Sequence, residues 1–392
     1  MKTSRIVCLF LVVLSCAPLF AADYKEEPFF PLNPSLMGKG ESDVADAHGY
    51  DALFTNPAGF SRDNGSFTLL STSSWVYSRP DALLSLGEAE AAGTATSTSL
   101  LSFMNTQVTT GGFGAGASAG IGYVGNGLGL GMAFIADSLV SGPSLFGLNG
   151  DLTGTLGFIG GLSFPVVLGP ARIHLGGDVR PMIRVHVPVS GATALGVLSA
   201  VATGGDALSA LNSASALYGV GIGLDFGSIV ELGWFSLGAS VRDLGGTQFR
   251  YATSSFGSTM NALGSQIKFP TGTDVADTYT IPMDVRVGAA FHPDFGTVSA
   301  IVDPSLSVDL DNVVGAVSGT APVWTLLHAG AEVRLLSLFT LSAGLDQGYL
   351  TAGMGLKLLF LDLNGALFTR ELGAHIGDMP NSGATLDLSL RW

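Results

Sequence analysis

The stretch Arg172–Val189 reads RIHLGGDVRPMIRVHVPV and alternates between two kinds of residue over its whole length. The odd-numbered positions are almost all apolar: Ile173, Leu175, Gly177, Val179, Pro181, Ile183, Val185, Val187 and Val189. The even-numbered positions include Arg172, His174, Asp178, Arg180, Arg184 and His186. A period of two places the two sets on opposite faces of a β-strand. A membrane-crossing strand needs roughly 9–11 residues, so this one is long enough to cross a bilayer and project beyond it.

The same two-sided pattern recurs from Ser66 to the last residue. The predicted strands are Ser66–Ser78, Gly112–Val124, Gly127–Ser138, Leu152–Val166, Arg172–Val189, Leu217–Ser228, Leu232–Leu244, Pro282–Pro293, Thr297–Asp309, Trp324–Leu336, Leu338–Asp346, Tyr349–Leu359, Leu361–Glu371 and Ala384–Trp392. That gives about 14 strands, an even number, as closed single-chain bacterial barrels have.

Composition distinguishes a transmembrane barrel from a soluble β-sandwich. Only 12% of the residues are charged, 47% are hydrophobic, and there are 55 glycines. Soluble domains carry about 25% charged residues, so much of this surface does not face water. Glycine is frequent on the polar strand faces, which suits a crowded interior. The sequence therefore predicts an all-β fold: a transmembrane antiparallel β-barrel whose apolar face meets lipid.

The N-terminus carries an export signal. Lys2 and Arg5 precede the short apolar run Ile6–Leu14, and Ala21 and Ala22 provide a cleavage site. An alternative is lipoprotein processing at Cys16, which is followed by an apolar stretch that suits a mature lipoprotein poorly. We expect a signal peptide at 1–21, an N-terminal segment without strand alternation at 22–64, and the barrel at 65–392.

Several functional classes are disfavoured. The net charge of -14 argues against a nucleic-acid partner. Both cysteines, Cys8 and Cys16, lie in the signal region, so the mature chain offers no thiolate ligands. The six histidines show no metal-ligand spacing, and no nucleophile elbow is present. We predict a non-enzyme without cofactor or metal.

The chain ends on an alternating strand with Leu388, Leu390 and Trp392 on one face. A terminal aromatic after such a strand resembles the signal that outer-membrane barrel-assembly machinery reads. We therefore expect that machinery and outer-membrane lipid as partners. Long connections at Pro80–Gly111, Gly191–Ala216 and Arg250–Ile281 are expected as extracellular loops, the first two with helical stretches. An alternative for the first connection is that it forms part of an interior plug.

The N-terminal segment carries a resemblance to a known family. Met37–Ala47, followed by Asp51–Gly59 with its Asn56-Pro57-Ala58-Gly59 turn, resembles the hatch of FadL-type outer-membrane transporters of long-chain fatty acids and other hydrophobic compounds. The C-terminal third is similar to PorV-type and spirochaetal members. The resemblance implies a 14-stranded barrel, a hatch that plugs the lumen, and a hydrophobic path to a lateral opening in the wall.

We therefore expect a transporter of fatty acids or other hydrophobic molecules that releases them into the bilayer. A fatty-acid carboxylate needs a cationic partner, and Arg172, Arg180 and Arg184 are candidates. The alternative is that these arginines pair with inward acids such as Asp225 and stiffen the wall. A PorV-type structural or secretion partner and a porin for small solutes remain open as functions.

Overall fold

The computed structural model describes residues 24–392 except 95, 146, 203–205, 207–208, 210, 267–269, 320–321 and 374. The expected signal peptide at 1–21 and the alternative at Cys16 lie outside the described residues. Among the helices that are described, none is long and apolar enough to cross a membrane.

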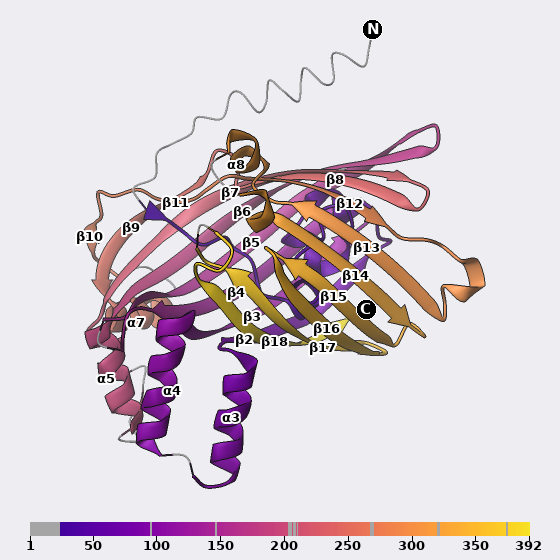
Figure 1. Ribbon diagram of the computed structural model, residues 1–392. Coiled ribbons are helices and arrows are strands. Elements are labelled where there is room, and N and C mark those ends of the chain that lie inside the picture. The colour runs from indigo at the N-terminus through magenta and orange to yellow at the C-terminus, as the bar shows by residue number, and fades with distance from the viewer. Residues whose placement is uncertain are drawn as a thin grey trace.

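Fourteen strands close into one antiparallel ring, which confirms the predicted fold class (Figure 1). The wall strands are β2 (Ser66–Tyr77), β3 (Phe113–Gly125), β4 (Leu128–Ser141), β5 (Asn149–Leu168), β6 (Ala171–Ser190), β7 (Ser215–Leu232), β8 (Phe235–Arg242), β12 (Asp284–Phe291), β13 (Val302–Leu310), β14 (Leu327–Leu335), β15 (Phe339–Asp346), β16 (Tyr349–Leu358), β17 (Leu361–Glu371) and β18 (Pro380–Arg391). Pairing of β18 with β2, from Gly383 opposite Tyr77 to Arg391 opposite Thr68, closes the ring.

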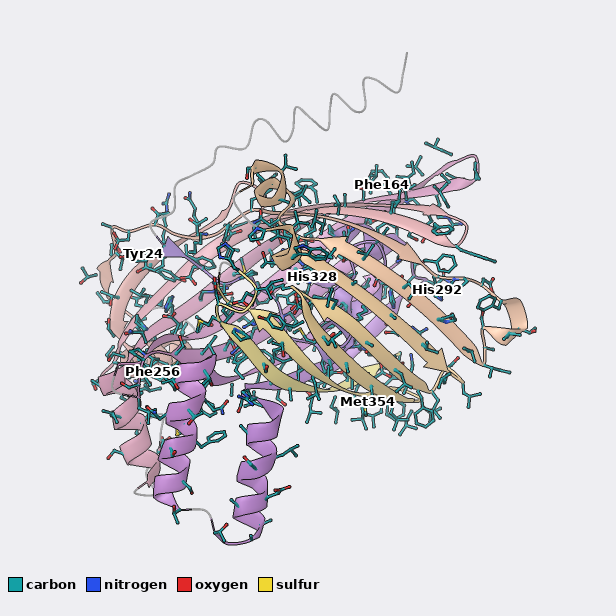
Figure 2. The ribbon with its side chains drawn as sticks, viewed as in Figure 1. Tyr24, Phe164, Phe256, His292, His328 and Met354 are labelled. Atoms are coloured by element: carbon teal, nitrogen blue, oxygen red, sulfur yellow. The ribbon has the colours of Figure 1, made fainter. Side chains whose placement is uncertain are left out.

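The two ends of the barrel differ. One end, here called the long-loop end, carries the helices α3 (Pro80–Ala91), α4 (Ser97–Thr110), α5 (Gly191–Ala202), α7 (Phe256–Gln266) and α8 (Val313–Ser318). The other, the short-turn end, joins β3 to β4, β5 to β6 and β7 to β8 by tight turns. The β5–β6 hairpin, which carries Phe164, extends beyond the neighbouring strands at the short-turn end (Figure 2).

Side chains alternate across the wall as the sequence pattern predicts. Outward positions such as Leu162, Ile222, Leu237, Met354 and Leu386 are exposed and apolar. The inward positions include many buried charged groups: Asp178, Arg180, Arg184, Asp225, Arg242, Asp309, His328, Asp346 and Asp387. An apolar outside and a polar inside are the arrangement of a barrel that stands in lipid.

One expected loop is partly a strand. The connection predicted at Arg250–Ile281 contains the end of β9 (Thr247–Ser255), α7, and the short strands β10 (Thr273–Asp274) and β11 (Tyr279–Ile281). The predicted strand Leu232–Leu244 ends at Arg242, and β9 takes over its place in the wall. Ser and Thr on both faces of β9 hide the alternation on which the prediction depended. Helix α4 was also missed, because its Ser/Thr-rich sequence has low intrinsic helix propensity.

Candidate functional site

The N-terminal residues Glu26–Arg62 lie inside the ring and contain α2 (Pro34–Met37), η1 (Gly49–Leu53) and η2 (Pro57–Ser61). We call residues 26–62 the lumenal segment. Phe29, Met37, Phe54 and Phe60 are almost completely buried. They form one apolar cluster with inward wall residues, including Trp75, Ile135 and Phe249. The apolar core of the molecule is therefore the packing between this segment and the wall.

The Asn56-Pro57-Ala58-Gly59 turn fastens the lumenal segment to the wall. Asn56 caps η2, because its Oδ1 accepts a hydrogen bond from the Ala58 amide at 3.0 Å. Its Nδ2 donates to the Val44 carbonyl at 2.8 Å and reaches the wall carbonyls of Ser228 at 3.4 Å and Ala239 at 3.3 Å. Pro57 occupies the first helical position, where its missing N–H costs nothing. The turn thus joins two parts of the segment to β7 and β8.

Glycines on the inner wall make room for this backbone contact. A Cβ at Gly227 would lie 1.8 Å from Asn56 Oδ1, one at Gly176 2.3 Å from the Pro57 carbonyl, and one at Gly238 2.4 Å from the Val44 carbonyl. The inward glycines that suggested a crowded interior therefore form a flat surface against which the segment packs.

The substitution Gly227→Ala should displace Asn56 and destabilise the barrel by about 1–3 kcal/mol, because overpacking forces the backbone to move. Urea unfolding and limited proteolysis of the lumenal segment measure both effects. Gly160→Ala is the matched control, because its Cβ would meet nothing nearer than Leu130 at 4.0 Å. Equal stability and equal protease resistance in the two variants would contradict the docking role of Asn56.

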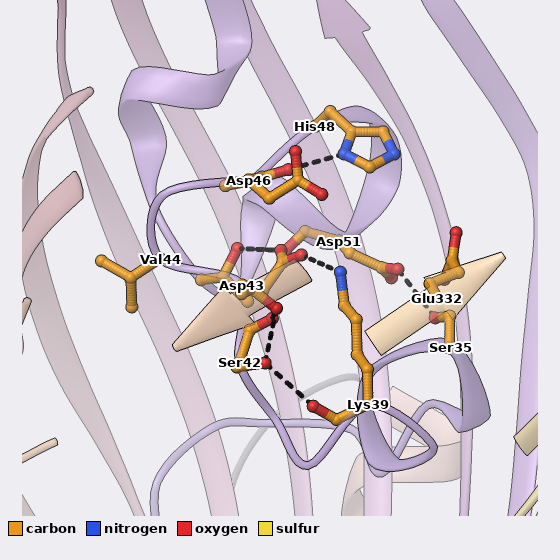
Figure 3. Close-up of polar contacts among 12 residues, drawn as sticks. Ser35, Lys39, Ser42, Asp43, Val44, Asp46, His48, Asp51 and Glu332 are labelled. Atoms are coloured by element: carbon orange, nitrogen blue, oxygen red, sulfur yellow. Dashed lines mark hydrogen bonds and ion pairs between the residues drawn. The ribbon is translucent and has the colours of Figure 1, made fainter. Parts of the chain in front are cut away.

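Charged groups hold the other side of the segment (Figure 3). Lys39 Nζ lies 2.5 Å from Asp43 Oδ1, and Asp309 Oδ2 on β13 accepts from the amides of Asp43 at 2.6 Å and Val44 at 2.8 Å. Burial alone would lower the pKa of Lys39, but the carboxylates of Asp43, Asp46 and Glu332 raise it above its ordinary value. The ammonium therefore stays charged inside the barrel and balances the acids around it.

The three arginines named from the sequence occupy different environments. Arg180 is fully buried and pairs with Asp225, and Arg184 is bound to Glu26 at 2.8 Å and to the Glu27 carbonyl at 2.9 Å. Arg172 is exposed at the short-turn end, where it lies opposite Glu231 in register. The structure thus pairs two of them with acids, and a role for any of them toward a ligand carboxylate stays a prediction.

Glu26 is the partner that sequence reasoning missed. Besides Arg184, its carboxylate accepts from Tyr251 at 3.0 Å and lies 3.1 Å from His186 Nδ1. Burial alone would raise the pKa of Glu26, but hydrogen bonding by His186 and the charge of Arg184 lower it. This carboxylate therefore binds the start of the lumenal segment to β6 and β9.

The wall is interrupted between β8 and β9. Strand β7 pairs with β9 through Ser215–Val220 and with β8 through Phe226–Leu232. No ladder pairing joins the residues between these two parts of β7, 221–225, to residues 242–249. Asp243, Gly245 and Gly246 adopt positive φ values of 50°, 77° and 85°. Residues 243–246 form a bulge, which we call the wall bulge. The sequence pattern gave no sign of it, although Gly245-Gly246 is turn chemistry.

One backbone hydrogen bond and one bond to a buried carboxylate close the wall at this point. Leu244 N donates to the Leu224 carbonyl at 2.8 Å, and Asp243 N donates to Asp225 Oδ1 at 2.8 Å. Behind these bonds lie the buried side chains of Asp178, Arg180 and Arg242. Neither carboxylate oxygen of Asp178 has a hydrogen-bond partner among the described residues. The wall bulge is therefore a weakly bonded place in the ring.

Apolar side chains surround the wall bulge on the outer face of β7. Val220, Ile222 and Phe226 are each more than half exposed. A molecule that crossed the wall here would pass from the buried charges of the lumen directly to an apolar, lipid-facing surface.

Two cavities flank the lumenal segment. The upper cavity, of about 140 Å³, lies toward the long-loop end and is lined by Phe29, Trp75, Tyr77 and Arg370, among others. The lower cavity, of about 660 Å³, lies toward the short-turn end and is lined by Lys39, Asp51, Arg334 and Trp392, among others. Residues 33–43, which include α2, contribute to the lining of both and separate them.

The upper cavity contains charged residues that the sequence did not single out as a site. Arg286 on β12 and Arg370 on β17 line it together with Asp137 on β4. All three occur at inward positions of alternating strands, which is the same signal that drew attention to Arg172. Alternation predicts which face of a strand a residue occupies but not its position along the barrel axis. The pattern therefore could not show that these residues line the same cavity. No group of three His, Cys, Asp or Glu residues that could hold a metal ion occurs among the described residues.

Comparisons with known proteins give similarity in structure only. No family model and no curated protein matches the chain. The chain is similar to several solved transporters. The Ralstonia pickettii toluene transporter TbuX is 14% identical at a TM-score of 0.48, with 92% of this chain and 98% of that chain covered. The Pseudomonas putida toluene transporter TodX is 14% identical at 0.43, with 91% and 98% covered.

A third solved structure, a Pseudomonas aeruginosa FadL homologue, is 12% identical at a TM-score of 0.43, with 93% of this chain and 99% of that chain covered. These scores are too low to support an argument about function, which depends here on the geometry described above.

Proposed function

We propose that this protein is an outer-membrane transporter of the FadL type that takes up hydrophobic small molecules and releases them sideways into the bilayer. The observation that carries the proposal is the wall bulge of a barrel whose lumen is filled by its own N-terminal segment. A filled lumen disfavours an open aqueous pore, and an interrupted ladder offers an exit that a regular wall does not.

The physical basis is desolvation. A hydrophobic solute that leaves water gains roughly 0.8 kcal/mol per buried methylene. A path from the upper cavity through the weakly bonded wall to lipid lets that gain drive transfer without an energy source. The long-loop end would then face the cell exterior, and the lumenal segment would act as the hatch.

The class of solutes proposed here includes long-chain fatty acids, with Arg172, Arg180 or Arg184 as partner for the carboxylate. The alternative on the same residues is structural, because removal of one member of a buried ion pair costs about 3–5 kcal/mol. Outer-membrane lipid and the barrel-assembly machinery, reading Leu388, Leu390 and Trp392, complete the proposed partners.

Uptake by proteoliposomes tests the proposal. Vesicles that contain the full-length barrel should take up oleate at least tenfold faster than empty vesicles and should exclude glucose. Arg184→Gln should raise the oleate dissociation constant about tenfold if the guanidinium binds carboxylate, and should lower only the melting temperature if the pair with Glu26 is structural. Glucose entry together with absent oleate uptake would show a porin instead.

A further inference from the structure

The upper cavity limits the size of the ligand that it can hold. Its volume of about 140 Å³ is close to that of an engineered apolar protein cavity of about 150 Å³ that binds benzene. Phe29, Trp75 and Tyr77 supply aromatic walls. A single ring or a short alkyl group fills this space, whereas a long acyl chain would extend out of it past the exposed residues Glu27 and Pro28.

Charged groups of both signs line the cavity. The guanidinium groups of Arg184, Arg286 and Arg370 and the carboxyl groups of Glu27, Glu41 and Asp137 all contribute to the lining. Arg184 is bound to Glu26, and Arg286 lies 2.5 Å from Asp284 and 3.0 Å from Asp311. With these partners counted, acids outnumber the guanidinium groups around the cavity, so a negative charge on a ligand would add repulsion where buried charge is already costly. The cavity therefore favours an uncharged ligand over an anionic one.

Asp137 makes an anionic ligand particularly unfavourable. Its carboxylate accepts hydrogen bonds from Trp75 Nε1 at 2.8 Å and from the Tyr77 hydroxyl at 3.1 Å, so it is fixed between two walls of the cavity. A second carboxylate placed beside these rings would meet the charge of the first at close range.

Arg370 supplies an unused hydrogen-bond donor. Its Nη2 donates to the Tyr77 hydroxyl at 3.1 Å, and its guanidinium carbon lies 5.0 Å from the centre of that ring. Among the described residues, no ion pair or hydrogen bond involves Nη1, whereas Nε lacks an acceptor but is sealed from solvent. Nη1 is therefore the donor for which an oxygen atom entering the cavity would be an acceptor.

From these observations we propose that the upper cavity binds a compact, neutral, ring-sized compound with one acceptor oxygen, such as a ketone, alcohol or phenol, to which Arg370 donates. This inference rests on the proposed transport function and narrows its substrate. The volume of the cavity favours a single ring, the surplus of acids disfavours an anionic ligand, and the unpaired Nη1 of Arg370 favours an acceptor oxygen.

Binding of matched probes to the full-length barrel in detergent tests the inference. Acetophenone should bind at least tenfold tighter than benzoate, which is charged, and than ethylbenzene, which lacks the oxygen. Arg370→Met should remove the advantage of acetophenone over ethylbenzene, and Arg370→Lys, which keeps a donor, should retain part of it. Arg334→Met, which removes a cation from the lower cavity, is the matched control and should leave all three affinities unchanged.

The outcomes separate this inference from the function on which it rests. Benzoate binding as tightly as acetophenone, or an acetophenone preference that survives Arg370→Met, overturns the inference. If Arg370→Met does not fold, the order of affinities in the unsubstituted barrel still decides it. Uptake of oleate or ethylbenzene without any preference for acetophenone leaves the transport function standing and refutes the ligand class. Failure of every hydrophobic probe to bind or cross refutes both.

Discussion

Deletion of Leu244 and Gly245 should lower the rate at which hydrophobic solutes reach the bilayer at least tenfold. The two residues left between Arg242 and Thr247 would then match the two residues, Pro282 and Met283, between Asp284 and Ile281 on the neighbouring strand. Opposite β7, the stretch between Val241 and Arg250 would shorten from eight residues to six, against the five residues 221–225. A nearly continuous ladder is therefore expected to replace the wall bulge and to narrow the weakly bonded exit. Transfer of a fluorescent fatty acid into the membrane of proteoliposomes measures the effect.

The control for this deletion is removal of two residues elsewhere. Ala92 and Gly93 lie exposed between α3 and α4, far along the chain from the wall bulge, and their deletion should leave transfer unchanged. Heat-dependent migration on gels confirms that both variants fold. Full transfer by the variant with the shortened wall bulge would show that solutes leave by another route.

Deletion of residues 38–60 should raise the leak of small polar solutes at least tenfold. This stretch contains Phe54, Asn56 and Phe60, whose side chains are buried inside the ring. A ring of this many strands without its filling would leave an aqueous channel, because barrel diameter grows with strand number. Single-channel conductance and liposome swelling with sugars of increasing size measure the leak.

Deletion of residues 82–94 in the long loop is the control, because it removes chain from outside the lumen. A barrel that stays closed to sugars without residues 38–60 would refute the plug role of the lumenal segment. Protein lost to misfolding is recognised by its absence from the heat-modifiable fraction.

Most of the wall could be predicted because the alternation of apolar and polar residues within each strand reflects which face meets lipid and which faces the lumen. Alternation at Arg172–Val189 and Leu361–Glu371 needs no knowledge of distant residues. Strand β9 escaped because Thr253, Ser254 and Ser255 are polar on both faces near the end of the barrel. The wall bulge was not predicted because it is a mismatch in residue number between neighbouring strands, which the sequence of one strand alone does not show.

The site was less predictable, since its contacts join residues far apart in the chain. Asn56 was recognised by its turn chemistry, yet its role depends on Gly227, which lies on a strand far along the sequence. Glu26 stands in a stretch without periodicity, and nothing nearby points to Arg184. From the sequence, Arg370 could be recognised only as another inward-facing cation. Its unpaired hydrogen-bond donor depends on neighbours that the folded barrel brings together.

The course of the lumenal segment constrains how the protein can be assembled. Its start, β1 (Tyr24–Lys25), pairs with β11 near the long-loop end, whereas Ser66, where the wall begins, stands at the short-turn end. The chain is therefore threaded through the ring from one mouth to the other. Inserting so many aromatic rings into a finished barrel would require them to pass the charged side chains of the inner wall. The simplest order is that the wall folds around the lumenal segment and that the pairing of β18 with β2 forms last, so that the segment is enclosed as the barrel closes.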